Sequence, residues 1–386
     1  MPATDDPWDV VIAGAGPAGL SAALVLGRCR RRVLLCDAGT PRNHATGAMH
    51  GYLGHDGIPP PAFRELAHEE LARYETVRFL RERVEDAEAI SPDRFRVVLS
   101  GGETAVARKL LLATGVVDEV PDIPGFAELW GSTVHSCPYC DGWELRDAPL
   151  AAYGRRRRGL EIARALTAWS RDLVLCTDGP SGLSREERAD LAANGIEVVE
   201  TRVERLEGRD RRLEAVVFAD GRRLPRRALF FDTPSWPQST LAARLGCAPN
   251  ARGGVRAGRL ESTTVPGVYV AGNILRDVQL AIVAAAEGCK AAFGINRSLT
   301  REEFVRRGRG VSPVEHPPVS EPESPAPEAD ATPRAIVPAE LPTVSVPERL
   351  PAPQARPAGD EGVVLVPPEP ADGTDAPPPD DPPIRS

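Results

Sequence analysis

A glycine-rich turn between two apolar strands limits the fold of this chain more than any other feature. The stretch WDVVIAGAGPAGLSAALVLGRCRRRVLLCDAG starts at Trp8 and predicts a strand over residues 10–13, a helix to about Arg28 and a second strand over residues 33–36. Both strands are continuously apolar, as in a parallel sheet that is covered on both faces. The chain is therefore expected to have an α/β fold.

The turn itself has the spacing of a dinucleotide-binding site. Three glycines follow the first strand as G-x-G-x-x-G, and an aspartate ends the second strand. In such a site the first glycine makes the turn, the second lets a pyrophosphate approach the backbone, and the third lets the helix pack against the strand. The helix N-terminus faces the phosphates, and the acid accepts hydrogen bonds from a ribose. The candidate residues are Gly14, Gly16, Gly19 and Asp37.

Two later stretches each contain an apolar strand that ends in small residues. KLLLATGVV, residues 109–117, leads into Ala113-Thr114-Gly115. TTVPGVYVAGNILRDVQLAIVAAAEGCKAA, residues 263–292, has a strand that ends at Gly272-Asn273 and then a long helix of small residues. The glycine turn alone does not distinguish NAD from FAD, so these later segments are needed to decide.

The segment HSCPYCDGWE, residues 135–144, contains the Cys-x-x-Cys pair Cys137 and Cys140, followed by Asp141. A structural zinc site needs four ligands, and the sequence has no second pair of this kind. A purely structural disulfide would be reduced in the cytosol. We therefore interpret the cysteines as a redox pair and expect no metal. Asp141 can take and return the proton that thiol–disulfide exchange moves.

Together these segments resemble the low-molecular-weight thioredoxin reductases and related FAD-dependent pyridine nucleotide-disulfide oxidoreductases, including the flavin dithiol oxidases, over about residues 8–300. The resemblance implies two nested Rossmann-like domains of the three-layer ββα type, with bound FAD. Asn273 stands where the family usually has aspartate, and because its amide is uncharged, we expect somewhat weaker FAD binding. For Arg42 and Asn43 a solvated loop is an equal alternative. The implied FAD contacts are Gly14, Gly16, Gly19, Asp37, Arg42, Asn43, Ala113, Thr114, Gly115, Gly272, Asn273, Gln279 and Leu280.

The stretch CPYCDG matches the redox motif of that family. By this resemblance Cys140 lies nearest the flavin, Cys137 exchanges with the partner, and Asp141 is the acid–base group. The implied activity is an enzyme that acts on sulfur groups and passes two electrons between FAD and the dithiol. The implied partner is a thioredoxin-like protein or a small dithiol or disulfide, and the implied assembly is a homodimer.

The middle of the chain predicts a second α/β domain. Strands PLAAYG, DLVLCT and IEVVE alternate with helices over residues 159–169 and 184–193, and a β-meander follows with turns at Gly208 and at residues 220–221. By resemblance, residues 118–240 form a nicotinamide-type domain that carries the redox pair. It is inserted between the two parts of an FAD domain, residues 8–117 and 241–305.

The glycine pattern of this second domain is damaged. Aligning Gly154 and Gly159 with the first and third glycines places Arg156 second, where a long side chain obstructs a pyrophosphate. The next strand leads into CTDGPSG without arginines for a 2′-phosphate, and Thr233-Pro234 replaces a usual glycine. The run GRRRRG predicts either phosphate clamps or a solvated basic turn. The sequence therefore argues against the use of NADPH or NADH without excluding it.

Three functions are compatible with these features. The first is a reductase that moves electrons from NADPH or NADH through FAD to a disulfide. The second is an NAD(P)H-independent dithiol oxidase, which the resemblance associates with small thiol-bearing substrates, dioxygen and hydrogen peroxide. The third is a non-enzymatic flavin-binding redox sensor, against which the intact dithiol and its aspartate argue.

Composition separates the last quarter of the chain from the rest. Residues 311–386 contain 21 of the 39 prolines and no apolar period, so we expect a disordered, acidic, proline-rich tail over residues 306–386. Residues 311–386 have 14 acidic and 4 basic residues and so contribute −10, whereas residues 1–310 contribute +2, which gives the net charge of −8. The nearly neutral remainder argues against a nucleic-acid partner.

Targeting signals are not evident. The N-terminal MPATDDPWDV is acidic, and no run reaches about 18 apolar residues, so we expect a cytoplasmic protein without a membrane partner. The seven cysteines do not suggest a secreted disulfide framework. Those outside the redox pair are expected to be buried core thiols: Cys29, Cys36, Cys176, Cys247 and Cys289.

Overall fold

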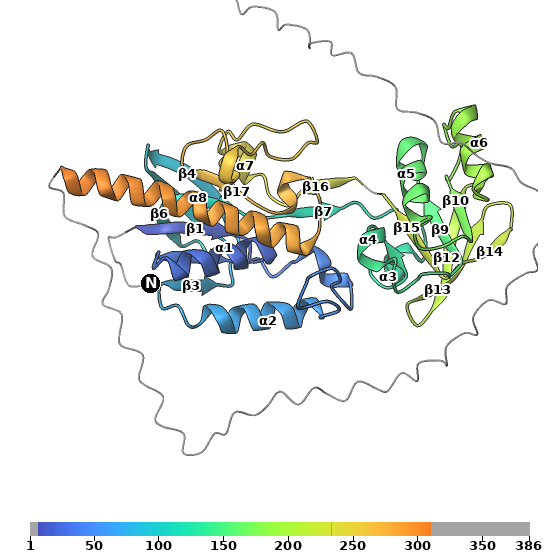
Figure 1. Cartoon of the computed structure of the whole chain (residues 1–386), viewed down its shortest axis with the longest axis horizontal. Coiled ribbons are helices and arrows are strands. Elements are labelled where there is room, and N and C mark those ends of the chain that lie inside the picture. The colour runs from blue at the N-terminus through green and yellow to red at the C-terminus, as the bar shows by residue number, and fades with distance from the viewer. Residues whose placement is uncertain (1–6, 233, 310–386) are drawn as a thin grey trace, which may run out of the picture. The chain divides into compact units, whose positions relative to one another are not determined.

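The computed structural model describes residues 7–232 and 234–309, which belong to one compact unit (Figure 1). Its largest sheet consists of β1 (Trp8–Ala13), β2 (Val33–Cys36), β3 (Val77–Leu80), β4 (Val84–Ser91), β5 (Arg94–Leu99), β6 (Thr104–Leu112) and β17 (Val268–Val270). The order is β3-β2-β1-β6-β5-β4, and β17 also pairs with β6. The pairs β3–β2, β2–β1, β1–β6 and β6–β17 are parallel, whereas β4 and β5 form an antiparallel ribbon on β6.

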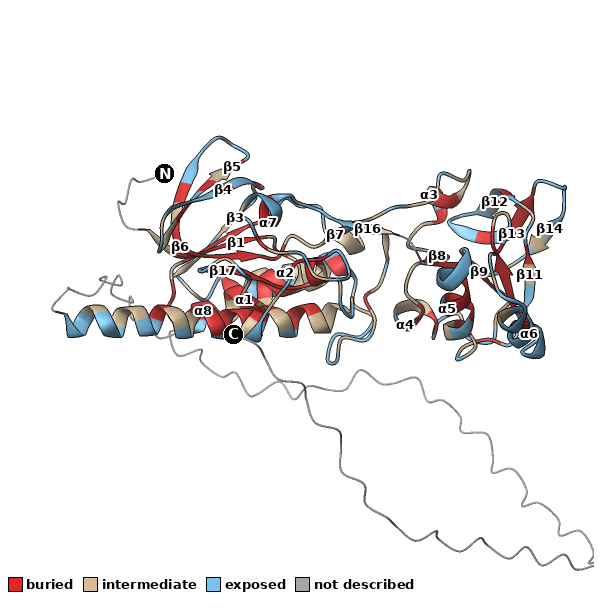
Figure 2. Cartoon of the chain, turned by 90° about the horizontal axis from the view of Figure 1, so that it is seen from above, coloured by how far each residue is buried: buried red, intermediate tan, exposed pale blue. Residues whose placement is uncertain are grey.

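Different elements cover the two faces of this sheet. Val10 and Ile12 of β1 are buried with helix α1 (Pro17–Arg28) and helix α8 (Ala281–Gly308). Val11 and Ala13 are buried on the opposite face with the β4–β5 ribbon and residues from 241–255. Figure 2 shows β1 and much of α1 as buried. This confirms the predicted three-layer α/β fold, because successive residues of a strand point to opposite faces.

Helix α8 is held against the sheet at two places. Near its start, small residues let it approach α1, since a Cβ atom on Gly288 would lie 2.0 Å from the carbonyl oxygen of Ala18. Near its end, Arg31 and Arg108 each donate to Glu303 at 2.7 Å, and Arg108 also donates to Asp9 at 2.9 Å. Helix α8, the last element of the described chain, therefore covers part of one face of the first sheet.

A second sheet has five parallel strands in the order β11-β10-β9-β15-β8. The strands are β8 (Val134–His135), β9 (Leu150–Tyr153), β10 (Leu173–Cys176), β11 (Glu197–Val199) and β15 (Ala228–Phe231), with helices α5 (Arg156–Leu166) and α6 (Arg185–Ala193). An antiparallel sheet follows, made of β12 (Val203–Arg209), β13 (Arg212–Phe218) and β14 (Arg223–Pro225).

The remaining elements are two short strands and several helices. Strand β7 (Val116–Asp118) precedes the second sheet in the sequence, and β16 (Ser235–Pro237) follows it. The two strands pair antiparallel with each other. The others are η1 (Arg42–Ala45), α2 (Pro60–Leu71), α3 (Phe126–Leu129), α4 (Pro138–Asp141), α7 (Leu241–Arg244), η2 (Arg259–Glu261) and η3 (Asn273–Leu275).

The structure differs locally from two sequence predictions in the middle of the chain. Helix α5 begins at Arg156 rather than at Gly159. The β12–β13 turn lies at Asp210–Arg211, with φ of 51° and 60°, and not at Gly208. Gly208 lies inside β12 instead, where a Cβ would come within 2.9 Å of the Leu129 side chain. The glycine therefore provides room for packing and not a reversal of the chain.

The predicted domain boundaries remain predictions, but one end is fixed. Helix α8 extends through Gly308, so it includes residues 306–308, which the sequence assigned to the tail. The rest of the predicted tail and Thr233 lie outside the described residues. Within residues 7–232 and 234–309, no helix combines the length and apolarity that crossing a membrane requires.

The burial of the remaining cysteines was predicted only in part. Cys36, Cys176 and Cys247 are buried, but the prediction is wrong for Cys29 and Cys289, which are exposed. Cys29 caps the C-terminus of α1, and Cys289 lies on α8 beside the buried Gly288. Sequence context does not show which face of a helix the packing covers.

Candidate cofactor and redox site

A cavity of about 830 Å³ brings the predicted site residues together. Gly19 is the one sequence candidate that does not line it, because it packs behind Gly14. The strands β1, β2 and β6 end at the cavity, as expected for a ligand site at the carboxyl edge of a parallel sheet. The candidates that line it are Gly14, Gly16, Asp37, Arg42, Asn43, Ala113, Thr114, Gly115, Cys137, Cys140, Asp141, Gly272, Asn273, Gln279 and Leu280.

The three glycines of the first turn have different surroundings. Gly14 has a φ of +109°, and a Cβ there would lie 2.4 Å from the Ala113 carbonyl oxygen. A Cβ on Gly19 would lie 1.8 Å from the Gly14 carbonyl oxygen. Gly16, the N-cap of α1, has nothing within 4 Å of such an atom. The first and third glycines are thus needed by the fold, whereas the second leaves open space in front of the helix N-terminus.

Asp37 follows β2 and is held by two groups. Its carboxylate accepts the backbone N–H of Gly39 at 3.1 Å and pairs with the Arg64 guanidinium from α2. Asp37 is buried and lines the cavity. Asp37 follows the second strand, as the sequence predicts, and its contact with a ribose stays a prediction. The sequence gave no sign of Arg64, because a contact between a strand end and a later helix depends on the fold.

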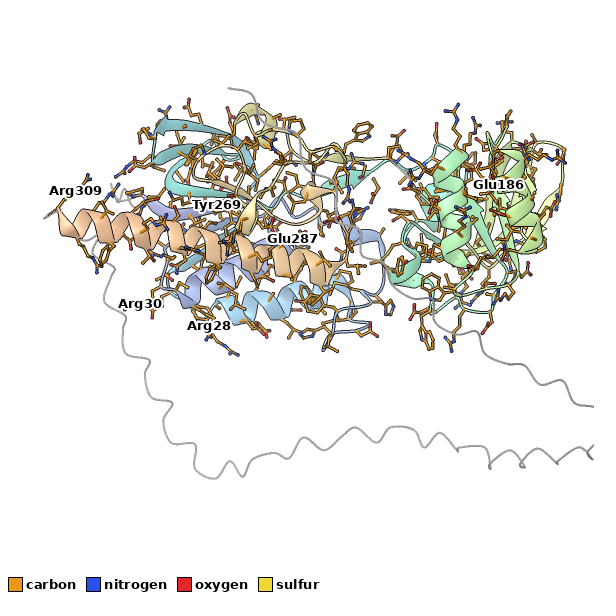
Figure 3. The ribbon with its side chains drawn as sticks, turned by 45° about the horizontal axis from the view of Figure 1, so that its top comes forward. Arg28, Arg30, Glu186, Tyr269, Glu287 and Arg309 are labelled. Atoms are coloured by element: carbon orange, nitrogen blue, oxygen red, sulfur yellow. A yellow bond between two sulfur atoms is a disulfide. The ribbon has the colours of Figure 1, made fainter. Side chains whose placement is uncertain are left out.

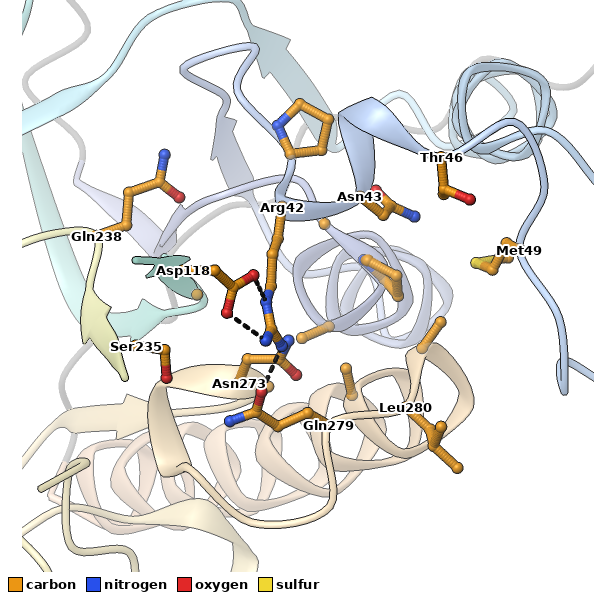
Figure 4. A pocket seen from close by; sticks show the side chains of 18 of the residues that line it. Arg42, Asn43, Thr46, Met49, Asp118, Ser235, Gln238, Asn273, Gln279 and Leu280 are labelled. Atoms are coloured by element: carbon orange, nitrogen blue, oxygen red, sulfur yellow. Dashed lines mark hydrogen bonds and ion pairs between the residues drawn. The ribbon is translucent and has the colours of Figure 1, made fainter. Parts of the chain in front are cut away.

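Arg42 is fixed by two side chains of the cavity wall (Figure 4). Its guanidinium donates two hydrogen bonds to Asp118, at 2.6 and 2.7 Å, and a third to Gln279. The side chains come from η1, β7 and the segment before α8. A bidentate arginine–carboxylate pair fixes both distance and plane. Asp118 was missed by the sequence analysis, and its position at the end of a three-residue strand is no signal for such a role.

One polar atom in the cavity wall has no partner in the protein. The hydroxyl of Thr114 is buried and makes no hydrogen bond with any residue that the structure describes. Buried polar groups in native proteins almost always find a partner. Because Thr114 follows the carboxyl end of β6 and lines the cavity, this hydroxyl is a candidate contact for a bound ligand.

The Gly272–Asn273 turn is held from behind by Glu287, a residue of α8 (Figure 3). Its carboxylate accepts the backbone N–H of Gly272 at 2.8 Å. Burial raises the pKa of Glu287 from 4.5 to about 7, and the nearby Glu261 adds to the increase. The sequence analysis did not identify Glu287, which therefore joins Arg64 and Asp118 among the supporting residues that it missed.

The redox pair lies in a short turn. Cys137 is the N-cap of α4, and its sulfur forms a disulfide with that of Cys140. Gly142, two residues after Cys140, lets the turn pack tightly against Trp169, because a Cβ at this position would lie 2.7 Å from the Trp169 ring. Across the described part of the chain, no group of three or more His, Cys, Asp or Glu side chains is arranged to hold a metal ion.

His135 lies beside the acid of the redox motif. The Nδ1 atom of His135 is 3.3 Å from Oδ2 of Asp141. The imidazole is buried and stacks on Phe230 of the neighbouring strand, with 5.3 Å between ring centroids and 30° between planes. Both His135 and Asp141 line the cavity. The sequence analysis assigned no role to His135.

The second glycine turn has the backbone of a dinucleotide site but not the space. A Cβ on Gly159 would lie 2.1 Å from the Gly154 carbonyl oxygen, the same close approach as in the first turn. Arg156, with φ of +53°, occupies the position of the second glycine. Its side chain packs on Gly182, where a Cβ would lie 2.9 Å away. This turn therefore carries an arginine where a dinucleotide-binding turn has the glycine that lets a pyrophosphate approach the backbone.

The neighbouring Arg155 covers the end of β10. Its Nε donates to the carbonyl oxygen of Thr177 at 2.8 Å, and its guanidinium lies 3.5 Å from the Asp178 carboxylate. A Cβ on Gly179 would lie 2.8 Å from the same guanidinium. In a dinucleotide-binding domain the end of this strand holds the ribose. The residues present therefore do not fit a nicotinamide dinucleotide in this arrangement.

Comparison with known proteins identifies the family. Residues 8–288 match the family model described as pyridine nucleotide-disulphide oxidoreductase. The chain is 34% identical over 281 residues to thioredoxin reductase tcpT of Claviceps purpurea, covering 70% of this chain and 87% of that protein. The chain belongs to the pyridine nucleotide-disulphide oxidoreductase family.

Solved structures of the same kind support this assignment. The crystal structure of HlmI is 39% identical, with a TM-score of 0.76 over 79% of this chain and 96% of that chain. The putative thioredoxin reductase TrxB from Bacillus anthracis is 34% identical, with a TM-score of 0.74 over 77% of this chain and all of that chain. This pyridine nucleotide-disulphide oxidoreductase resembles thioredoxin reductases and is an oxidoreductase that acts on sulfur groups.

Proposed function

We propose that the chain is an FAD-dependent thiol–disulfide oxidoreductase that passes two electrons between FAD and the Cys137–Cys140 pair. The observation that carries the proposal is the shared cavity, whose wall includes both the glycine turn of α1 and the disulfide. Two further features support FAD as the group bound there. Gly16 leaves open space at the helix N-terminus, and the buried Thr114 hydroxyl has no partner within the described residues.

The roles of the cavity residues follow from their positions. Gly14 and Gly16 would receive the pyrophosphate at the N-terminus of α1, and Asp37, oriented by Arg64, would accept hydrogen bonds from the adenosine ribose. Asn273 would contact the ribityl chain with a neutral amide. When bound, FAD supplies a two-electron carrier next to the dithiol. The remaining proposed contacts are Arg42, Asn43, Ala113, Gly115, Gly272, Gln279 and Leu280.

The cysteine turn supplies the reacting sulfurs. Cys137 and Cys140 are both partly exposed, so an external thiol or disulfide can reach the pair. In the proposed assignment Cys137 exchanges with the partner, and Cys140 exchanges electrons with the flavin. Asp141 follows directly and would take or return the proton. The partner is a thioredoxin-like protein if electrons flow outward, which the names of the relatives support, and a small dithiol if they flow inward.

A second candidate reverses the flow, and the two arginines of the second glycine turn favour it. Because Arg155 and Arg156 occupy the positions of a ribose and a pyrophosphate, the usual nicotinamide donor does not fit. In the reverse direction a substrate dithiol loses two electrons and two protons to become a disulfide. Dioxygen accepts both electrons and both protons and becomes hydrogen peroxide. The third alternative, a flavin-binding sensor without catalysis, disagrees with the assignment of the chain as an oxidoreductase that acts on sulfur groups.

An anaerobic titration of the purified holoprotein tests these proposals. Loss of the flavin absorbance on addition of NADPH or NADH would support the reductase. Loss on addition of dithiothreitol alone, with hydrogen peroxide formed on re-aeration, would support the oxidase. A protein that fails to bind FAD would contradict both, and a bound flavin that no reductant bleaches would favour the sensor.

Substitution of one cysteine separates binding from turnover. We expect Cys140→Ser to abolish dithiol turnover while FAD remains bound. Cys29→Ser is the matched control, because Cys29 is exposed at the end of α1 and does not line the cavity. Full turnover by Cys140→Ser would show that its proposed role is wrong. The predicted homodimer, the cytoplasmic location and the absence of nucleic-acid and membrane partners remain predictions.

A further inference from the structure

The Cys137–Cys140 pair lies between two residues that face each other, His135 and Asp141. His135 ends strand β8, at the edge of the second sheet, and Asp141 ends helix α4. The chain reverses between them, so that Nδ1 of the imidazole lies 3.3 Å from the carboxylate. Stacking on Phe230 fixes the plane of the ring. The pair is therefore built by the same turn that holds the disulfide.

A carboxylate alone is poorly suited to hold a proton at neutral pH. With an ordinary aspartate pKa of about 3.9, about one side chain in 1,000 is protonated at pH 7. An imidazole with an ordinary pKa of about 6.5 is protonated in about one case in four under the same conditions. Acid–base transfer is most effective when the pKa lies near the working pH. A histidine in contact with Asp141 therefore adds a group that can hold a proton near neutral pH.

We infer that His135 holds the proton that Asp141 exchanges with the dithiol, so that the two side chains act as one proton-holding pair. His135 acts through Asp141 and is therefore a positioning residue. This inference rests on the proposed function, because it assigns a further residue to the same dithiol chemistry. Its substrate class is a small molecule with two thiols that can form a disulfide.

The step can be written with its atoms and electrons. A substrate thiol gives its proton to Asp141 and His135, and the thiolate attacks the Cys137 sulfur. The bond between Cys137 and Cys140 breaks, a mixed disulfide forms at Cys137, and Cys140 leaves as a thiolate. The second substrate thiol then attacks the mixed disulfide, and its proton goes to Cys137. The substrate loses two electrons and becomes a disulfide, and the enzyme disulfide gains them as a thiol and a thiolate.

Several charged side chains of the cavity wall pair with residues other than His135 and Asp141. The carboxylate that lies 3.3 Å from Nδ1 of His135 is that of Asp141, and Phe230 from β15 brings no charge to the ring. Elsewhere in the cavity wall, Arg42 is already paired with Asp118. Asp232, which lines the cavity, lies 3.8 Å from the Arg158 guanidinium. A second histidine of the wall, His50, has its Nδ1 3.6 Å from the Asp56 carboxylate and 3.7 Å from the Glu144 carboxylate. The other charged side chains of the wall are Arg83, Arg276 and Asp37, which pairs with Arg64.

A rapid-quench experiment tests the inference without using the flavin signal. Oxidised holoprotein is mixed anaerobically with dithiothreitol between pH 5.5 and pH 9.5 and quenched with acid, and free cysteines are then alkylated. Mass spectrometry then gives the rate of disulfide reduction as the amount of oxidised dithiothreitol formed, because one molecule forms at each reduction even when the dithiol has already passed its electrons to FAD. For the wild type we expect the rate of reduction to rise with pH through an inflection that depends on His135.

The variant His135→Gln should lose this inflection. We expect a rate about tenfold lower at pH 7, which is less than the roughly 10²–10⁴-fold contribution of a group that transfers the proton directly, because His135 acts through Asp141. Above about pH 9 the substrate thiol is largely ionised without help, so the rates of variant and wild type should converge. Asp141→Asn, on the more exposed side of the pair, should behave in the same way. His68→Gln on α2 is the control, because this histidine does not line the cavity.

Each outcome decides one question. If His135→Gln keeps the inflection, or slows reduction equally at every pH, the inference is wrong. If His135→Gln does not fold, Asp141→Asn decides by the same criteria. If the wild-type disulfide is reduced without any inflection, the inference alone fails. If dithiothreitol does not reduce the wild-type disulfide at any pH, the proposed function is wrong, and the inference that rests on it is wrong too.

Discussion

Glu287 is the residue whose substitution gives the sharpest prediction. Its carboxylate is partly buried on α8 and accepts the backbone N–H of Gly272 at 2.8 Å. Glutamine keeps the shape and can accept the same hydrogen bond through its amide oxygen, but it cannot ionise. Glu287→Gln should therefore leave the cavity wall in place and remove only the cost of a buried negative charge.

The pKa of Glu287 gives the size and direction of the effect. Burial raises this pKa from 4.5 to about 7, so the unfolded chain loses its proton at lower pH than the folded protein does. Stability is then lost as the pH rises from about 4.5 to about 7 and stays constant above that value. The full shift corresponds to at most about 3 kcal/mol. Because the side chain is partly exposed to water, we expect about 1–2 kcal/mol.

Thermal unfolding of the FAD-free protein measures the difference. Glu287→Gln should match the wild type at pH 4.5 and unfold at a higher temperature at pH 8, by about 1.5–2 °C for each kcal/mol, since the described part of the chain has about 300 residues. Glu186→Gln, at an exposed position on α6, is the control and should not show this growth with pH. A difference between Glu287→Gln and the wild type that is the same at both pH values would refute the reasoning.

Three other predictions follow from the contacts. Gly16→Ala should lower FAD affinity and leave the unfolding temperature of the FAD-free protein unchanged, because its Cβ meets nothing within 4 Å; Gly19→Ala should lower both, because its Cβ would lie 1.8 Å from a carbonyl oxygen. Equal unfolding temperatures for these two variants would contradict that distinction. Arg108→Met should destabilise the protein by about 3–5 kcal/mol in denaturant unfolding, because it leaves the buried Asp9 without its ion-pair partner. A loss below about 1 kcal/mol would mean that Asp9 is satisfied by its other contacts. Gly142→Ala should slow dithiol reduction in the rapid-quench assay, because the new methyl group would displace the cysteine turn from the Trp169 ring, and an unchanged rate would show that the turn tolerates this movement.

The sequence predicts the parts of the site that depend on local sterics. The spacing of Gly14, Gly16 and Gly19 locates the turn and the start of α1, because only glycine allows the close approaches found at the first and third positions. The aspartate at the end of β2 and the disulfide turn are likewise set by residues close together in the chain. Local rules of this kind also place most strands, since continuous apolar runs identify buried parallel strands.

The sequence does not predict contacts between side chains that are far apart in the chain. Arg42 was predicted either to contact a flavin or to lie in a solvated loop, and the sequence gave no sign of the hydrogen bonds to Asp118 and Gln279 that fix it in the cavity wall. The damaged second glycine turn was recognised from Arg156, but the covering of the β10 end by Arg155 requires the three-dimensional arrangement. His135 gave no signal, because its pairing with Asp141 depends on how β8 and α4 are joined in space.

The order in which the elements appear along the chain has a consequence for synthesis on the ribosome. Strand β17 pairs with β6, and helix α8 packs against α1, yet both are the last of the described elements to be made. The five-stranded sheet, in contrast, is complete once residue 231 has emerged. During synthesis the five-stranded sheet can therefore form before α8 is available to pack on its face of β1. Until α8 has been made, part of this apolar face stays exposed and can be bound by chaperones.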